Sequence, residues 1–439
     1  MVYNAKLSPI NLLIHRRRLV KKMRYRFPII ALGLWLLAAI YPGYTGTISV
    51  SGWAIGKRAA TTLESKQLKE AIDLSAAYLV KQCRRNGKFL YRINVNPAIR
   101  PKPKYNLLRH AGAIYSLASY DQTYPQQLTQ NTLKRATDFL KISVIAPIPG
   151  KNDLLAVWSK PEITRSAKPL QAKLGGTGLG LVALLSVEKR IPGTTSVEYL
   201  RKMGNFLVYM QKMDGSFYSK YIPEKGGRDD SWTSLYYPGE AALGLLMLYE
   251  RDPALTWLQA AANSMAYLAR KRGGKNLVEA DHWALLATAK LLPLYDRCRQ
   301  PLPKAAIERH AVQICESILK SLPLKYDNPI RYGGFTEDGR TTPTAIRLEG
   351  LLAALSFLPA DYSDLRKKMV AAIDEGMQFL LRSQIQSGEH AGGIPRAIHT
   401  LPEDHPQFKK SFNRRATEVR IDYVQHSLSA MLQYERSFF

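Results

Sequence analysis

The chain has 439 residues, of which 46% are hydrophobic and 22% are charged, so its composition is that of a globular protein rather than a disordered one. Its 63 lysines and arginines exceed its 35 acidic residues, and the net charge of +28 attracts anionic partners. The sequence has no recognised nucleic-acid-binding motif, no C-x-x-C pair and no Cys/His spacing typical of zinc. We therefore expect no nucleic-acid partner, no metal and no cofactor.

The N-terminal segment has the order of an export signal. Residues 1–26 carry eight lysines and arginines and no acid, and residues 27–41 form an apolar stretch, FPIIALGLWLLAAIY. We predict a basic cytoplasmic tail at 1–26, a signal anchor or signal peptide at 27–47 and a linker at 48–62. Basic residues remain on the cytoplasmic side, so the rest of the chain should lie outside the cytoplasm, periplasmic or extracellular. A cleaved signal, which would make the protein secreted, and a buried core helix remain open.

A polar or glycine-rich cluster followed by an apolar helical segment recurs six times between Arg109 and the C-terminus. The apolar segments are rich in Ala, Gly and Leu and nearly free of charge, which is typical of buried helices. One anchor residue marks each repeat: His110, Gly176, Glu240, His282, Glu349 and His426. Internal repetition of this kind predicts a repeat architecture.

A longer and more charged amphipathic stretch precedes each apolar segment. Its apolar residues fall at helical spacing, as Leu200, Met203 and Leu207 illustrate. The six stretches cover residues 68–83, 128–142, 197–213, 255–271, 305–322 and 365–383. Charged outer helices alternating with buried inner ones predict an all-α (α/α)6 toroid over residues 63–439, because the hairpins need each other to bury their faces.

This layout resembles the six-hairpin toroid superfamily of glycoside hydrolases, polysaccharide lyases and sugar epimerases. The resemblance covers about residues 63–439 and includes a Gln-x-x-Asp-Gly-Ser-Phe stretch at residues 211–217. That stretch is common to toroids of several chemistries, so it implies the fold rather than one reaction, and it points to no single close family. The resemblance implies a carbohydrate-active protein.

In a closed ring of hairpins the inner helices run parallel, so their N-termini should meet at one mouth that favours anions. Glycoside cleavage usually needs two carboxyl groups, and we expect the catalytic residues among four acids. Glu240 follows a proline suited to a first helical turn, and Asp281 precedes the fourth apolar segment. Asp230 lies on a glycine-rich loop, and Glu349 lies inside the fifth segment. Each acid also has a structural explanation, as a helix cap, a dipole partner, a loop residue or half of an ion pair.

Histidines, arginines and aromatic residues near the same end are candidates for substrate binding. Histidine transfers protons near neutral pH, arginine binds carboxylates with two hydrogen bonds, and aromatic rings stack on sugars. The candidates are His110, Arg109, Tyr236, Tyr237, His282, Trp283, Arg347, His426, Trp232 and Arg396. We expect the main cavity to be lined by His110, Glu240, Asp281, His282, Glu349 and His426.

Two functions of different classes fit these features. The first is an envelope-anchored enzyme that acts on an acidic or cell-surface polysaccharide or oligosaccharide by hydrolysis, elimination or epimerisation. The second is a non-catalytic carbohydrate-binding or assembly subunit of a polysaccharide biosynthesis or export system. Geometry separates them: two facing carboxyls about 5–10 Å apart favour hydrolysis. Tyrosine or histidine near arginine favours elimination or epimerisation, and a mouth without paired groups favours binding.

Overall fold

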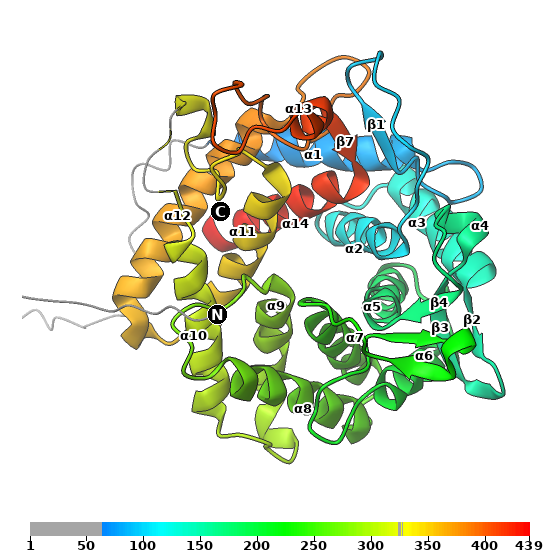
Figure 1. The fold of residues 1–439 in the computed structure, drawn as a ribbon. Helices are drawn as coiled ribbons and strands as arrows, with labels where there is room; N and C mark the ends of the chain where they lie inside the picture. Colours follow the sequence, from blue (N-terminus) through cyan, green and yellow to red (C-terminus); the bar gives the residue numbers. More distant parts are fainter. Residues whose placement is uncertain (1–63, 324–325, 327) are drawn as a thin grey trace, which may run out of the picture. The chain divides into compact units, whose positions relative to one another are not determined.

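Six inner helices form a closed ring (Figure 1). The computed structural model describes residues 64–323, 326 and 328–439, which lie within the second of two units, Ala59–Phe439. Each inner helix contacts the next in chain order, and the last contacts the first, which closes the ring. The inner helices are α2 (Leu107–Thr123), α5 (Leu174–Arg190), α7 (Tyr237–Arg251), α9 (His282–Leu291), α11 (Thr341–Leu355) and α14 (Ile421–Phe438).

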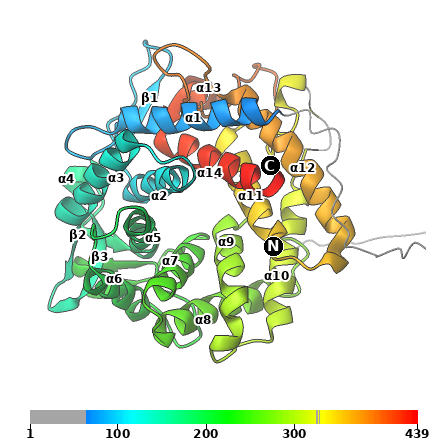
Figure 2. The same ribbon diagram turned by 180° about the vertical axis from the view of Figure 1, so that it is seen from behind.

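Six outer helices surround this ring and alternate with the inner helices along the chain (Figure 2). Most of them contact both neighbouring inner helices, as α8 contacts α7 and α9. The outer helices are α1 (Ser65–Gln82), α3 (Gln127–Phe139), α6 (Val197–Tyr209), α8 (Leu255–Arg272), α10 (Lys304–Lys320) and α12 (Ser363–Ser383). The predicted toroid of six helical hairpins is therefore confirmed.

The inner helices are buried on all sides because their side chains are small or apolar. In α5, the consecutive residues Leu181, Val182, Ala183 and Leu184 are fully buried. Gly178 allows the backbones of α5 and α7 to approach closely, since a Cβ there would lie 2.8 Å from the carbonyl oxygen of Glu240. Close packing of this kind leaves little space between the inner helices.

The expectation of an all-α domain was wrong in one respect, because two small antiparallel sheets accompany the ring. One has five strands in chain order and the other pairs the first strand with the last. The strands are β1 (Arg92–Asn94), β2 (Ile145–Ile148), β3 (Lys151–Ser159), β4 (Gln171–Lys173), β5 (Lys220–Ile222), β6 (Gly227–Asp229) and β7 (Glu418–Arg420). β4 leads directly into α5 and β7 leads directly into α14, so the sheets fix the chain at the start of two inner helices.

Short helices complete the described part of the chain. They are α4 (Pro161–Thr164), α13 (Lys410–Ala416), the π-turn η1 (Leu140–Val144) and the 3-10 turns η2 (Pro223–Lys225), η3 (Leu292–Arg297), η4 (Pro329–Arg331) and η5 (Ala360–Tyr362). Among the described residues, no helix is long and apolar enough to cross a membrane. The predicted anchor at residues 27–47 lies outside the described residues and stays a prediction.

Candidate active site

A cavity of about 350 Å³ opens where the inner helices begin, as the repeat predicted. It is lined by Arg109, Tyr236, His282, Trp283, Arg340, Thr342, Pro343, Ile346, Arg396, Arg415, Arg420, Tyr423 and His426. These residues come from the first two turns of α2, α9, α11 and α14, from the residues directly before α7, α11 and α14, and from α13 and the segment before it. Within the described chain, no aspartate or glutamate lines this cavity. The cavity therefore differs from the sites of glycoside hydrolysis, which usually contain a pair of carboxyl groups.

Two histidine rings face each other beside the cavity. The ring centroids of His282 and His426 are 5.5 Å apart and the rings are nearly perpendicular. Neither ring nitrogen of His282 has a hydrogen-bond partner among the described residues. Burial, aided by the positive charges of His426 and Arg109, lowers the pKa of His282 well below its ordinary value. His282 is therefore neutral at pH 7.

Glu349 holds the second histidine. It is fully buried on α11, and its Oε2 lies 2.7 Å from Nδ1 of His426 and 3.9 Å from Nε2 of His282. Burial raises the pKa of Glu349, whereas the adjacent His426 opposes that rise. A carboxylate bonded to one ring nitrogen fixes the tautomer and orientation of the imidazole and leaves the other nitrogen for chemistry.

The same three side chains form the one group among the described residues that could hold a metal ion. Each offers one ligand atom, and these atoms lie within 4.8 Å of one another. Two histidines and a glutamate can bind zinc. However, Arg109 and Arg420 line the same cavity, and Oε2 of Glu349 is already bonded to Nδ1 of His426. A zinc ion would add positive charge beside these arginines, which is electrostatically unfavourable. We therefore interpret His282, His426 and Glu349 as acid/base groups.

Five arginines give the cavity its positive charge: Arg109, Arg340, Arg396, Arg415 and Arg420. Four of them pair with three carboxylates, Asp338, Asp422 and Glu418. Buried Asp422 accepts from both Arg109 and Arg420, which lowers its pKa against the effect of burial. Arg396 pairs with no described carboxylate, and its Nη1 is buried without a hydrogen-bond partner. The cavity lining therefore has more arginines than paired carboxylates.

Basic residues also stand directly before three inner helices. Lys173, Arg340 and Arg420 immediately precede α5, α11 and α14. A cation at a helix N-terminus is disfavoured by the helix dipole, which prefers an anion there. Three inner helices therefore begin beside a positive charge, at ends where the helix dipole favours an anion.

Glu240 does not line the cavity. It lies in the first turn of α7 between this helix and α5, where a Cβ on Gly175 would almost touch its Oε2. Burial raises the pKa of Glu240 to about 8, although Arg109 opposes the shift. Its Oε2 has no hydrogen-bond partner among the described residues. Glu240 is therefore a buried carboxyl behind the cavity wall, and it is neutral at pH 7.

Asp281 and His110 were also expected to line the cavity, and the structure places both elsewhere. Asp281 caps α9 by accepting from the N–H of Ala284 at 3.1 Å, and it accepts from Arg272 at 2.7 Å. His110 turns outward, where its Nε2–H donates to the carbonyl of Ala136 at 2.9 Å and its Nδ1 accepts from a tyrosine hydroxyl. Both side chains are satisfied by the protein itself, which favours structural roles.

Four other candidates lie behind or beside the cavity. Arg347 donates from Nη1 to the carbonyl of Phe335, and burial lowers its pKa. Tyr237 is buried, and its ring contacts the half-exposed ring of Trp232 at 5.8 Å. Asp230 is exposed and pairs with a lysine. Of the expected binding residues, those that line the cavity are Arg109, Tyr236, His282, Trp283, Arg396 and His426.

The six anchors lie at different depths in their helices. His282 is the first residue of α9, whereas Glu349 lies two turns inside α11 and His426 lies in the second turn of α14. This difference in depth lets Glu349 reach His426 from the neighbouring helix. Arg415 and Arg420 were not among the residues predicted from the sequence. Arg420 could have been predicted, because it directly precedes an inner helix.

No protein-family model matches the chain, and no curated protein sequence is significantly similar to it. Solved structures match its fold. The cellobiose 2-epimerase from Bacillus thermoamylovorans B4167 aligns with a TM-score of 0.61 at 12% identity, covering 85% of this chain and 98% of that one. A D-mannose isomerase aligns with a TM-score of 0.59 at 11% identity, covering 87% of this chain and 100% of that one. A family 88 glycosyl hydrolase from Bacteroides vulgatus aligns with a TM-score of 0.53 at 14% identity, covering 86% of this chain and 100% of that one.

The chain has the (α/α)6 toroid fold of these proteins. At 11–14% identity, the structural similarity establishes the fold but not the reaction, which depends on the residues of the site. In this toroid the groups suited to chemistry are His282, His426 and Glu349, and the groups suited to binding an anion are the cavity arginines.

Proposed function

We propose that this protein is a carbohydrate-acting enzyme that moves a proton at a sugar carbon next to a carbonyl or carboxyl group, as an epimerase or isomerase does. The facing pair of His282 and His426 in an arginine-lined cavity carries this proposal. Among the functions considered from the sequence, histidine near arginine is the arrangement that favours epimerisation or elimination.

The reaction follows from the charge state of each group. His282, neutral at pH 7, takes the proton from the carbon, and the electron pair of the C–H bond moves toward the carbonyl oxygen. The cavity arginines stabilise the negative charge that forms on that oxygen. His426 then donates a proton to the opposite face of the carbon, which yields the epimer, and solvent returns both rings to their starting states. Glu349 positions His426 through its bond to Nδ1.

Two further observations support this choice over hydrolysis. The cavity lining that the structure describes contains no carboxyl group, so a carboxylate pair across the bond is not available there. Two of the proteins with the same fold are named as a cellobiose 2-epimerase and a D-mannose isomerase, which are reactions of the proposed class. The excess of arginine over acid favours a substrate with a negative charge.

We also propose that residues 27–47 hold this activity outside the cytoplasm.

Hydrogen exchange tests the proposal directly. The full-length protein is incubated in D₂O with uronic-acid and neutral oligosaccharides, and NMR follows loss of the C–H signal and appearance of the epimer. We expect exchange with an acidic sugar, and a decrease of about 10²–10⁴-fold in His282→Gln and His426→Gln. His390→Gln, a substitution in a loop away from the cavity, is the matched control.

The outcome also separates the enzyme from a binding protein. Sugar binding without exchange in the wild-type protein would favour a non-catalytic carbohydrate-binding or assembly subunit. New reducing ends without exchange would indicate hydrolysis, and a double bond in the product would indicate elimination. Each of these three results contradicts the proposed epimerase or isomerase.

A further inference from the structure

Two more basic cavities adjoin the candidate active site. The first, of about 340 Å³, is lined by Arg92, Asn94, Ile99, Arg100, Pro101, Lys102, Lys104, Ser411, Arg414, Arg415 and Glu418. The second, of about 180 Å³, is lined by Lys104, Tyr105, Asn106, Leu107, Ser159, Thr164, Ser166, Lys168, Gln171 and Lys173. Arg415 belongs to both the active-site cavity and the first of these, and Lys104 joins the first to the second.

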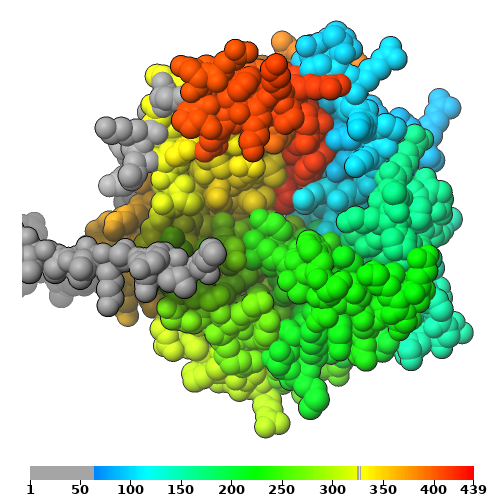
Figure 3. Space-filling view, viewed as in Figure 1, coloured from blue at the N-terminus to red at the C-terminus, as the bar shows by residue number. Residues whose placement is uncertain are grey.

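The β1–β7 pair and α13 bring these positions together from distant parts of the sequence. β1 pairs with β7, so that Arg92 lies opposite Arg420. Figure 3 shows the segment around α13 in orange beside the segment around β1 in blue. The three cavities therefore follow one another over the face on which the inner helices begin.

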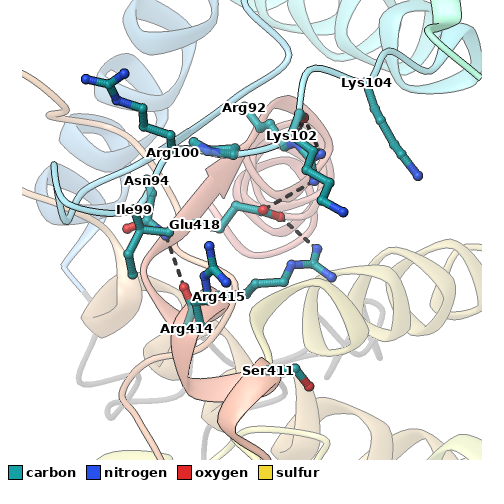
Figure 4. Close-up of a pocket in the computed structure, with 11 residues that line it drawn as sticks. Arg92, Asn94, Ile99, Arg100, Lys102, Lys104, Ser411, Arg414, Arg415 and Glu418 are labelled. Carbon is teal, nitrogen blue, oxygen red and sulfur yellow. Dashed lines mark hydrogen bonds and ion pairs between the residues drawn. The ribbon is translucent and has the colours of Figure 1, made fainter.

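Positive charge in the two outer cavities is poorly compensated. Their single described acid, Glu418, already accepts from Arg92 at 3.3 Å and Arg415 at 2.8 Å (Figure 4). Half-buried Lys173 has no ion pair with a described residue. Burial lowers its pKa, and the nearby charges of Lys168, Lys220 and Arg109 lower it further. Burying a cation without a partner is costly, and an anionic ligand would remove that cost.

We propose that the three cavities form one extended site for an acidic oligosaccharide, with the reacting sugar beside His282 and further negatively charged sugars in the two outer cavities. We call the two outer cavities the basic track. The proposal rests on the proposed function, because it takes the active-site cavity as the position of the reacting unit.

The chemistry of the basic track favours a sugar chain over other polyanions. Hydroxyl side chains also line the track, among them Ser411 and Ser166, and hydroxyls can both donate to and accept from sugar hydroxyls. The described lining offers one aromatic ring, Tyr105, which is buried, so it lacks the exposed rings on which single-stranded nucleic acid stacks. The track is also concave and shares Arg415 with the cavity that the histidines line, which a lipid surface would not require.

The test measures how affinity depends on chain length. Isothermal titration of the full-length protein in detergent uses oligogalacturonates of one to eight sugars and neutral cello-oligosaccharides of equal length. We expect affinity for the acidic series to increase with length and to decrease with added salt. Lys102→Gln/Lys104→Gln should weaken binding of the longest acidic chain by about ten-fold and leave the monosaccharide unchanged.

The matched control is Lys367→Gln/Lys368→Gln, which removes the same charge from an exposed position on α12. This variant should bind every oligosaccharide as the wild type does. Affinity that does not increase with length, or an equal loss in both variants, would overturn the basic track. Equal binding of a single-stranded oligonucleotide or of phosphatidylglycerol vesicles, with the same sensitivity to both variants, would also overturn it.

Exchange in D₂O is measured on the same samples, which keeps the two proposals distinguishable. Length-dependent acidic binding without exchange supports the basic track and contradicts the proposed reaction. Exchange on a monosaccharide without any effect of length supports the reaction and contradicts the basic track.

Discussion

Glu240 offers a quantitative test of how this core is built. Its side chain is 2% exposed, Oε2 has no described hydrogen-bond partner, and burial raises its pKa from 4.5 to about 8. A carboxyl with a raised pKa holds its proton more tightly in the folded than in the unfolded protein. Its contribution to stability is therefore complete below pH 4.5 and is lost as the pH rises toward 8. The free energy of unfolding should decrease by roughly 5 kcal/mol over this range because of this one group.

Glu240→Gln replaces the acid by a neutral amide of the same shape and removes that loss. An unfolding entropy of about 2.1 cal/mol/K per residue gives this domain about 0.8 kcal/mol/K, so 5 kcal/mol corresponds to roughly 6 °C. At pH 5 the variant and the wild type should unfold within about 2 °C of each other. At pH 8.5 the variant should unfold roughly 6 °C higher, as differential scanning calorimetry at both pH values would measure.

Glu250→Gln is the matched control on the same helix, because Glu250 is about half exposed and pairs with Lys290. Its unfolding temperature should differ from that of the wild type by the same small amount at both pH values. A Glu240→Gln difference that stays constant between pH 5 and pH 8.5 would contradict the burial argument. The variant should also retain proton exchange, and a folded variant without exchange would return Glu240 to the catalytic role expected from the sequence.

Three further predictions concern the site and the cellular location. Glu349→Gln should lower kcat by about 10²-fold with little change in KM, and shift the pH profile of the rate, because His426 loses its charged partner. Proton exchange should persist after dialysis against EDTA, and its loss with recovery on adding zinc would identify the histidine–glutamate trio as a metal site. A reporter fused after Phe439 should be active outside the cytoplasm, and activity restricted to the cytoplasm would rule out the predicted anchor.

The ring of helices could be predicted because its signal is periodic and repeated. The third outer helix was expected to begin at Val197, and α6 begins there. The apolar pattern of the fifth segment begins at Ala345, whereas the fifth inner helix begins at Thr341. The Thr-Thr-Pro-Thr run before Ala345 is typical of a loop, although Pro343 suits a first helical turn. The sheets were missed because most strands have three or four residues, too few for an alternating pattern, and β1 and β7 lie more than 300 residues apart.

The candidate site was predictable in position but not in the direction of its side chains. His110 and His282 both lie at the start of an inner helix, yet one bonds to outer helix α3 and the other borders the cavity. A helix position fixes which end of the ring a residue occupies, whereas its rotation about the helix axis depends on packing. The bond between Glu349 and His426 spans 77 residues and follows from the different depths of these residues, which no local pattern encodes.

Several basic residues at the mouth lower the stability of the fold, and this supports the proposed acidic substrate. Lys173, Arg340 and Arg420 each oppose a helix dipole, which costs about 0.3–1 kcal/mol apiece in exposed positions and more when partly buried. Arg396 adds a buried guanidinium nitrogen without a described partner. Arg340 and Arg420 recover part of this cost through Asp338 and Asp422, and the proposed acidic substrate would offset the rest. A carboxylate placed among them gains the helix dipoles and the guanidinium groups at once, so the same charges that weaken the free protein strengthen its complex.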